Sequence, residues 1–493
     1  MQKKQTILVV ASLLLVVLSV TLAYFTAQII GKGKDVSVSS ADLKIIFTDS
    51  DGAISGSNIE PGWSDTKTFT VENNSKSEYK YNIVIKDLLN TFVTNGYLQY
   101  KITSANGGYN MTEFKDVPKS SVATDTILAY SVVIPNGVTQ SYTIEFKYAN
   151  DESVDQSDDM GKKLSGKLFI TEGTEDPNKT LYNQLLADKS TVLTRTDFSK
   201  VLTDNNTKTL YTSTEDSKTV YYFAGNATDN WVKFGKNASN QDLYWRIIRT
   251  NSDGGVRLLY HGTSTTATDA YIRTSTFNSS YNNIAYVSYM YGNLGSVANA
   301  RENTTDSTIK TIIDNWYKDN LNTNYGKYLS TTAVYCNDRS TSDNTNFGAF
   351  TRLGTNKTPS YDCAATEDKF TVDSTVGNGK LTYPIALMTA DEVSFAGGVY
   401  GTNAPAWYYY NSANGSSTGS TWWWLLSPNF WDGSRAGVFF VGGSSFPGSF
   451  SGDYVGNTGN VRPAISLKSC IKYSTGNGSA SDPYTIKETS SGC

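Results

Sequence analysis

Residues that could catalyse a reaction are sparse in this chain. Nucleophilic hydrolysis by a serine or cysteine usually needs a nearby imidazole, and the 493 residues include a single histidine, His261,. This histidine ends a β-like run, so we interpret it as a structural residue. The sequence has no HExxH, Walker or dinucleotide-binding motif,. We expect no catalytic residues and no cofactor, with a hydrolase or oxidase hidden in the C-terminal region as the less favoured alternative.

Acidic side chains suggest two further chemistries. Asp391, Glu392, Asp432 and Asp453 are candidates for a carboxylate pair that cleaves a glycosidic bond, although nothing in their spacing supports it,. The same acids, with Asn457, could hold a structural calcium ion through oxygen atoms. Solvated turn residues are the simpler interpretation, so we expect no metal site.

All four cysteines lie in the last third of the chain, at positions 336, 363, 470 and 493. A zinc site is disfavoured because there is no CxxC motif and the histidine is distant in sequence. Two disulfides are expected if the chain is exported. Three pairings are open, of which Cys336–Cys363 and Cys470–Cys493 close the shortest loops.

The chemistry that remains is recognition by aromatic side chains. Residues 422–450 read WWWLLSPNFWDGSRAGVFFVGGSSFPGSF. In a strand, Trp422 and Trp424 share one side and Trp423 takes the other. Small or β-branched residues of the next strand are core candidates, namely Ala436, Val438 and Val441. We expect the positions between them to face outward, where rigid rings among serine and glycine give a large contact area for little ordering entropy.

An apolar run at residues 7–30, preceded by two lysines, is long enough to cross a membrane as a helix,. We interpret residues 1–34 as a membrane anchor or a cleaved signal peptide, for which small residues at 21–23 offer a cleavage site. Either interpretation exports the rest of the chain, to the outer face of the cell membrane or into the medium. The net charge of −4 without basic clusters argues against nucleic acid as a partner,.

Residues 35–172 show period-two alternation in seven or eight short runs separated by turn residues, which predicts an all-β antiparallel sandwich,. Within them lie IEPGWS at 59–64 and ENNS at 72–75, and LAYFTA ends the apolar run. Together these segments resemble the camelysin-like family of exported Gram-positive surface and biofilm-fibre proteins. The resemblance implies a β-sandwich with a structural or matrix role and brings no catalytic residues.

Residues 173–217 are polar, and we interpret them as a linker with one short helix at LYNQLLADK,. Residues 218–493 then alternate β-like runs with a few helices. Turn residues at 252–255 predict a hairpin. Apolar residues at helical spacing predict an amphipathic helix over 307–321. Thr389 with Glu392 three residues later predicts a capping box at a helix start.

Six C-terminal segments are distinctive: YYFAGN with NWVKF, YWRIIRTNSDGGVRLLY, VYCNDRS, YPIALMTADEVSFAGG, WWWLLSPNF and GNVRPAISL. Together they resemble a C-type-lectin-like domain of unknown function that recurs in exported proteins of gut-associated Firmicutes. They are also similar to the variable proteins of diversity-generating retroelements. The resemblance implies an α+β C-type-lectin-like fold for residues 218–493.

Two segments frame the fold in that family. One is rich in tryptophan and ends in Ser-Pro, and the other reads V-R-P-A. The matching frame positions are Trp422, Trp423, Ser427, Pro428, Val461, Arg462, Pro463 and Ala464. Ligand-contacting positions of the variable relatives fall between the frames. Carried over by resemblance, they are Asn429, Phe430, Trp431, Ser434, Arg435, Phe439, Phe440, Phe446, Phe450 and Tyr454.

The sequence differs from two groups of proteins with related folds, and these differences argue against their functions. The acid and asparagine pairs that hold calcium and sugar in animal lectins are not recognisable, so sugar binding is not implied. Formylglycine-generating oxidases share the broad fold, but their cysteine pair is missing from the matched segments. We expect an exported bacterial surface protein that recognises an extracellular protein or glycan through its aromatic face. The alternative is a structural subunit of a surface or biofilm-matrix fibre.

Overall fold

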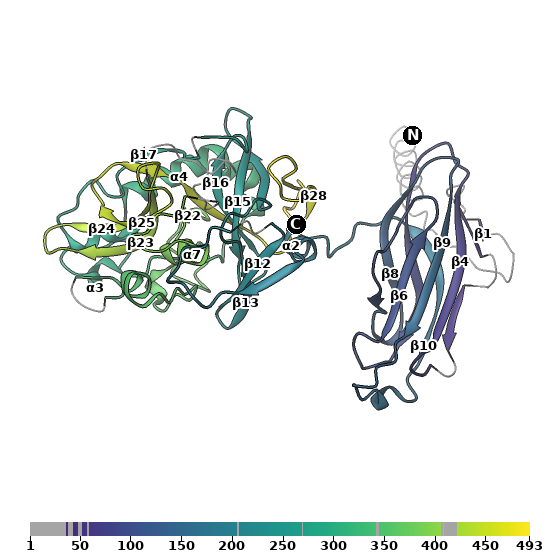
Figure 1. The fold of residues 1–493 in the computed structure, drawn as a ribbon. Coiled ribbons are helices and arrows are strands. Elements are labelled where there is room, and N and C mark those ends of the chain that lie inside the picture. The colour runs from purple at the N-terminus through teal and green to yellow at the C-terminus, as the bar shows by residue number, and fades with distance from the viewer. Residues whose placement is uncertain are drawn as a thin grey trace, which may run out of the picture. The chain divides into compact units, whose positions relative to one another are not determined.

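The computed structural model describes residues 36–37, 43–47, 52–56, 59–204, 207–268, 270–341, 345–405, 408 and 422–493. The chain divides into two compact units, Met1–Pro177 and Asn178–Cys493 (Figure 1). The apolar run at 7–30 lies outside the described residues. No helix within the described ranges is long and apolar enough to cross a membrane. Strands outnumber helices in both units, as predicted for a mostly β protein.

The first unit consists of two antiparallel sheets. The six-stranded sheet has the order β1 (Val36–Ser37), β2 (Leu43–Phe47), β4 (Ser64–Asn73), β9 (Thr139–Tyr148), β6 (Leu98–Ser104) and β7 (Lys115–Asp116). The four-stranded sheet has the order β3 (Ala53–Gly56), β10 (Leu164–Glu172), β5 (Tyr79–Asn90) and β8 (Ser120–Ile134). A single 3-10 turn, η1 (Ser157–Asp159), precedes β10.

One hydrophobic core serves both sheets of the first unit. The core forms because each strand points alternate residues inward, as in β9, where buried and less buried residues alternate along the strand,. Its inward residues include Ile144 and Phe146, and those of β5 in the other sheet include Ile83 and Ile85. The all-β architecture predicted from alternation is therefore observed.

The second unit contains two larger sheets. Seven strands of the ten-stranded sheet pair in the order β11 (Thr191–Thr194), β12 (Thr209–Glu215), β13 (Lys218–Tyr222), β15 (Asp242–Thr250), β14 (Trp231–Lys236), β29 (Tyr484–Ile486) and β28 (Tyr473–Thr475). The other three form a branch, in which β16 (Val256–Gly262) pairs with β15, β27 (Pro463–Leu467) pairs with β16, and β22 (Ile385–Leu387) pairs with β27. The five-stranded sheet runs β17 (Arg273–Ser275), β26 (Gly459–Val461), β23 (Trp423–Trp431), β24 (Ala436–Val441) and β25 (Phe450–Tyr454).

Shorter elements connect these sheets. The short strand pairs are β18 (Met290–Tyr291) with β19 (Thr305–Asp306) and β20 (Tyr335–Cys336) with β21 (Lys369–Phe370). The α-helices are α2 (Leu181–Asp188), α3 (Val297–Ala300), α4 (Thr308–Asn320), α5 (Asn322–Tyr325), α6 (Gly348–Phe350) and α7 (Ala390–Phe395). The remaining helical turns are η2 (Ile284–Val287), η3 (Gly326–Tyr328), η4 (Thr351–Asn356) and η5 (Thr366–Asp368).

Residues 178–217, which the sequence predicts as part of a linker, contribute helix α2 and strands β11 and β12 to the second unit. Leu181 and Leu185 of α2 are buried in its core, and the amide of Leu181 donates to the carbonyl of Ile471. Strand β11 pairs in parallel with β12. All four residues of β11 are exposed.

Several local predictions are confirmed. Strands β15 and β16 form the expected antiparallel hairpin, with Gly254 at a φ of +81° in its turn,. Helix α4 occupies the predicted amphipathic segment, and Ile309, Ile313 and Tyr317 face the core. Its first turn is capped by Ser307, whose Oγ accepts from the amide of Lys310 at 3.2 Å,.

The four cysteines form the two disulfides that close the shortest loops, Cys336–Cys363 and Cys470–Cys493. No cysteine is free. Disulfides persist in oxidising compartments, so both bonds support an extracellular location for this unit.

Replacing Ser307 by alanine should lower the stability of the second unit by about 1 kcal/mol, because the first turn of α4 loses its side-chain acceptor. Urea unfolding followed by tryptophan emission measures this loss. Ser296→Ala is the matched control, since it removes the same cap from the four-residue helix α3 and should cost less. Equal losses in the two variants would contradict the assignment of α4 as a stability determinant.

Candidate functional site

The segment predicted to bind a ligand forms most of the five-stranded sheet. Strands β23, β24 and β25 lie side by side, and a turn at 432–435 joins the first two. The ring centres of Trp422 and Trp424 are 4.4 Å apart, so these side chains share one side as predicted,. Trp423 packs against Arg462, whose guanidinium carbon lies 5.1 Å from its ring centre. Trp423 and Trp424 are both buried, so β23 is covered on both faces.

The frame positions form the interior support of this sheet. All but the half-buried Trp422 are buried: Trp423, Ser427, Pro428, Val461, Arg462, Pro463 and Ala464. The hydroxyl of Ser427 accepts from the amide of Ala390 at 3.0 Å, which ties β23 to α7. Nε of Arg462 donates to the carbonyl of Tyr260 at 2.8 Å, which ties the chain before β27 to β16.

Three of the ten predicted ligand-contacting residues belong to the core instead. Asn429, Phe439 and Phe450 are each no more than 1% exposed. The ring centre of Phe439 lies 5.7 Å from that of Tyr400 and 5.8 Å from that of Phe450. The prediction that Phe439 faces solvent is wrong, because the chain around Tyr400 covers the side of β24 that alternation leaves open. None of these three residues is available to a ligand.

The other seven predicted residues keep accessible surface. Ser434, Arg435 and Phe446 are exposed, and Phe446 is 64% exposed. The half-buried ones are Phe430, Trp431, Phe440 and Tyr454. Phe440 packs against Trp422, with ring centres 5.0 Å apart, which leaves only part of it for contact.

A stack of side chains organises the turn end of the sheet. Phe430, Gly437 and Tyr454 lie opposite one another on three neighbouring strands. The ring of Phe430 crosses Gly437, where a Cβ would lie 2.4 Å from it, and meets the ring of Tyr454 edge-on at 5.4 Å. The guanidinium carbon of Arg435 lies 3.7 Å from the ring centre of Tyr454. We call Phe430, Trp431, Asp432, Ser434, Arg435 and Tyr454 the hairpin patch.

Tyr281 borders the hairpin patch and was not predicted from sequence. It is 48% exposed, and its carbonyl accepts from the amide of Ala436. Its ring lies against Gly456, where a Cβ would be 2.9 Å from a ring carbon. These contacts use backbone groups and a missing side chain, so no residue pattern in the sequence signals them.

The four acids considered as catalytic carboxylates occupy two unrelated settings. Asp391 and Glu392 lie on α7 and bind arginines. Asp432 accepts from the amides of Ser434 and Arg435 in the β23–β24 turn. Asp453, on β25, accepts from its neighbour's amide and from Asn457. These contacts account for the acids as helix and turn residues, without a shared substrate position.

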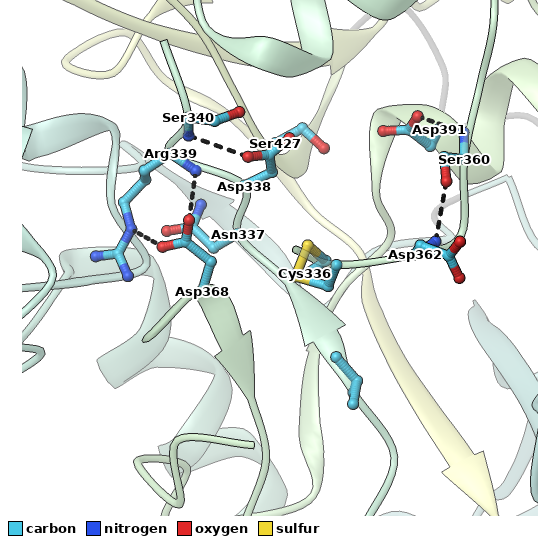
Figure 2. Close-up of a disulfide and its surroundings, with 12 residues drawn as sticks. Cys336, Asn337, Asp338, Arg339, Ser340, Ser360, Asp362, Asp368, Asp391 and Ser427 are labelled. Carbon is cyan, nitrogen blue, oxygen red and sulfur yellow. Dashed lines mark hydrogen bonds and ion pairs between the residues drawn. A yellow bond between two sulfur atoms is a disulfide. The ribbon is translucent and has the colours of Figure 1, made fainter. Parts of the chain in front are cut away.

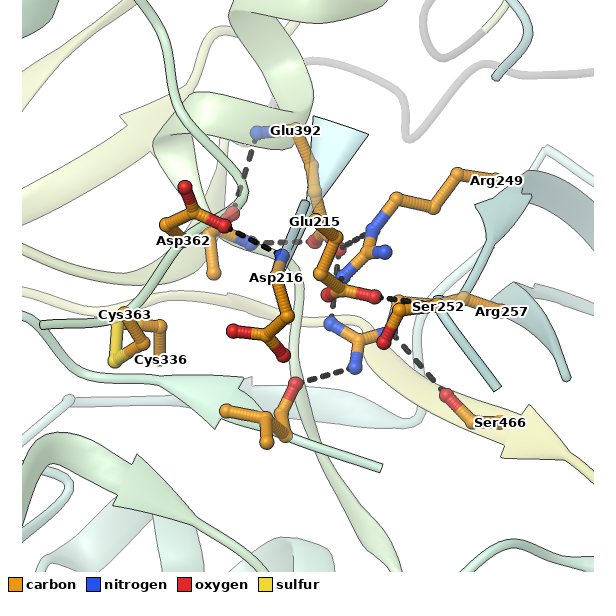
Figure 3. A network of polar contacts seen from close by, with 12 residues as sticks. Glu215, Asp216, Arg249, Ser252, Arg257, Cys336, Asp362, Cys363, Glu392 and Ser466 are labelled. Atoms are coloured by element: carbon orange, nitrogen blue, oxygen red, sulfur yellow. Dashed lines mark hydrogen bonds and ion pairs between the residues drawn. A yellow bond between two sulfur atoms is a disulfide. The ribbon is translucent and has the colours of Figure 1, made fainter. Parts of the chain in front are cut away.

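Glu392 is the centre of a buried charge network, which we define as Glu215, Arg249, Arg257 and Glu392 (Figure 3). Oε1 of Glu392 accepts from both arginines at 2.9 Å. Its Oε2 accepts from the amide of Thr389, which completes the predicted capping box. Arg249 also donates to Glu215 at 2.7 Å. The two carboxylates and two guanidiniums thereby balance one another.

The electrostatics of this network keep its acids ionised. Burial alone would raise the pKa of Glu215, but the charge and hydrogen bond of Arg249 outweigh it and lower the pKa to about 2,. Burial also opposes ionisation of Glu392, yet the charges of Arg257 and Arg249 hold its pKa below the ordinary value. These acids are stabilising ions, not proton donors at neutral pH.

Polar side chains lie around the disulfide Cys336–Cys363, and Figure 2 shows Asp338, Ser360 and Asp391 among them. Arg352 binds Asp391 through two hydrogen bonds and Asp338 through a third. The amide of Ser360 also donates to Asp391. The cavity enclosed between these residues and the buried charge network measures about 20 Å³. That volume holds about one water molecule, so it is too small for a substrate.

His261 has the surroundings of a structural residue. It is fully buried, with its ring centre 4.4 Å from that of Trp231 and its Nδ1 3.4 Å from Arg462. Burial lowers its pKa well below the usual value, and the charges of Arg462 and Arg246 lower it further. The imidazole is therefore neutral at pH 7 and faces arginines and an indole.

Among the described residues, no group of three or more histidine, cysteine, aspartate or glutamate side chains is arranged to hold a metal ion. Comparisons with protein-family models, curated proteins and solved structures found no match for the chain. Inference about function therefore rests on the geometry of the hairpin patch and its support.

Acid should weaken the second unit through Glu215. Because the folded pKa is depressed, its contribution is complete above the unfolded pKa near 4.5 and is lost as pH falls toward about 2,. Glu215→Gln should lower stability at pH 7 by on the order of 3 kcal/mol and flatten the acid dependence between these values. Urea unfolding at a series of pH values measures both effects. The control Glu488→Gln removes an exposed acid and should leave stability at pH 7 unchanged. An unaltered acid profile for Glu215→Gln would refute the assignment.

Proposed function

We propose that this chain is an exported bacterial surface protein whose second unit, a C-type-lectin-like domain, binds an extracellular protein or glycan through the hairpin patch. The observation that carries the proposal is the partly exposed stack of Phe430, Tyr454 and Arg435 at the end of a sheet whose strands β23 and β24 are mostly buried. Both disulfides support the extracellular setting,.

Contacts within the chain support the turn of the hairpin patch. Asp432 accepts from two turn amides and pairs with Nε of Arg435 at 3.2 Å. Tyr454 supports the other side of the same guanidinium. Side chains that are already ordered lose little entropy on binding. Tryptophan, tyrosine and arginine are also the residues that dominate binding energy at interfaces.

The contacts of the buried acids in this unit favour a recognition role over a catalytic role. Asp391, Glu392 and Glu215 are committed to arginines, and the cavity beside them holds about one water molecule,. Phe446, on the loop between β24 and β25, offers a further exposed ring near the same sheet. The binding surface we propose is thus smaller than the sequence suggests and excludes Asn429, Phe439 and Phe450.

A structural role in a surface or matrix fibre is the second candidate. The observation in its favour is strand β8, which spans Ser120–Ile134 at the edge of the four-stranded sheet and exposes Val122 at 70% and Val133 at 41%. Edge strands of this kind are open to pairing with another chain. Electron microscopy of the purified protein separates the candidates, since filaments favour the fibre and dispersed monomers favour the receptor.

Trp431→Ala combined with Arg435→Ala should weaken ligand binding by about 2 kcal/mol or more, roughly thirtyfold, because both anchors of the hairpin patch are lost. Arrays of glycans and of extracellular proteins identify a ligand, and titration measures its affinity. Lys200→Ala is the matched control, since it removes another exposed base paired at i,i+3 in the same unit. Unchanged affinity in the folded double variant would refute the proposal.

A further inference from the structure

Lys189 and Asp229 form a buried pair in the second unit. Lys189 follows helix α2 directly and is 5% exposed, and Asp229 is 6% exposed. The lysine Nζ lies 2.7 Å from Oδ2 of Asp229 and 3.1 Å from its backbone carbonyl. The rings of Phe223 and Tyr484 lie 5.5 and 5.6 Å from the same nitrogen. The amine and the carboxyl are therefore held in contact among aromatic side chains.

This pair is incompletely compensated as an ion pair. Oδ2 of Asp229 also accepts from the amide of Lys208 at 2.8 Å, whereas its buried Oδ1 has no hydrogen-bond partner among the residues that the structure describes. Removing two charges from water costs several kcal/mol each, and good geometry with every lone pair satisfied is needed to offset that cost. An amide between the two side chains would carry no charge and would leave one neutral carbonyl oxygen in place of a charged carboxylate. The surroundings thus favour the condensed product over the separated ions.

The hydroxyl of Tyr484 connects the amine of Lys189 to a second carboxylate, that of Asp188. Nζ of Lys189 donates to the hydroxyl of Tyr484 at 3.4 Å, and that hydroxyl donates to Oδ2 of Asp188 at 2.7 Å. Burial raises the pKa of Tyr484, and its hydrogen bond to Asp188 raises it further, so the phenol keeps its proton. Tyr484 and Asp188 together form a route for moving a proton to and from the amine.

We propose that Lys189 and Asp229 condense into an intramolecular amide bond. Proton transfer within the pair gives a neutral amine and a carboxylic acid, and the amine nitrogen attacks Cγ of Asp229. The new N–C bond replaces a C–O bond. The nitrogen passes one proton through Tyr484 to Asp188, and the hydroxyl leaves as water with a proton returned from Asp188 across the cavity that both aspartates line. Ammonium plus carboxylate becomes amide plus water, so no oxidant or activated co-reactant is required.

The surroundings allow the water to leave. A cavity of about 620 Å³ borders Lys189 and Asp229, and its mostly polar lining includes Asp188, Lys208 and Asn477. The bond would join positions 40 residues apart. Between them lie strands β11, β12 and β13 at one edge of the ten-stranded sheet. Because the chain enters this unit at Asn178, the bond would stop tension on that end from peeling the edge strands away.

Mass spectrometry of the intact, denatured full chain tests the proposal. We expect the wild-type protein to weigh one water molecule less than its sequence requires, after the hydrogens lost to both disulfides are counted. Protease digestion after reduction should release a branched peptide that contains both Lys189 and Asp229. A full mass with separate peptides for the two residues would overturn the proposal and leave a buried ion pair.

Three variants make the result specific. Lys189→Arg keeps the positive charge but cannot form this bond, so it should regain the full mass. Lys310→Arg is the matched control, because Lys310 is also buried and pairs with Asp314 at 2.6 Å, yet Asp306 at 3.2 Å adds a second compensating charge. It should retain the loss of one water, and regain of the full mass there would assign the bond to the wrong lysine.

Asp188→Asn tests the proton route while leaving the reacting pair intact. A fraction of this variant should keep the full mass after purification and lose the water slowly on incubation, which a purely structural role of Asp188 would not produce. Complete condensation at the wild-type rate would overturn the role of Asp188. None of these readouts depends on ligand binding, so their outcome is independent of the receptor proposal.

Discussion

The second unit depends on one constraint, which is that four buried charges must meet. Glu215 ends β12, Arg249 lies on β15, Arg257 on β16 and Glu392 on α7. An unpaired charge at any of these sites would cost several kcal/mol, because each of the four residues is buried,. The network is complete only when all four elements are in place. The charges are therefore compensated only when the sheet and α7 are both in place.

That constraint reaches the hairpin patch through a short series of backbone contacts. Helix α7 starts at a capping box built on Glu392, and the amide of its first residue, Ala390, donates to Ser427 on β23. The amide of Leu426 donates to the carbonyl of Met388, just before the helix. Strand β23 is thereby fixed to the charged core at its middle. Its far end, where the aromatic rings reach solvent, inherits a rigid position.

The sequence predicts those local elements whose formation depends on residues close together in the chain. The hairpin at 252–255, helix α4 and the box of Thr389 and Glu392 follow from residues a few positions apart, and they are found. The sequence signals the role of Glu392 as a cap but not its two arginines, which lie 143 and 135 positions away. Phe439 was misplaced for the same reason, because its cover comes from Tyr400. The receptor function and the lectin-like family stay predictions.

The hairpin patch contains packed residues and exposed turn residues, and these two groups differ in which substitutions they can accept. Phe430 packs across Gly437 onto Tyr454, so a larger residue at 437 would displace the ring and break the stack. These three positions are coupled and can change only together. Ser434 and Arg435 sit in an exposed turn shaped by Asp432, and their side chains leave the core untouched. Exposed turn residues can therefore be exchanged while the frame of buried tryptophans and Arg462 stays in place.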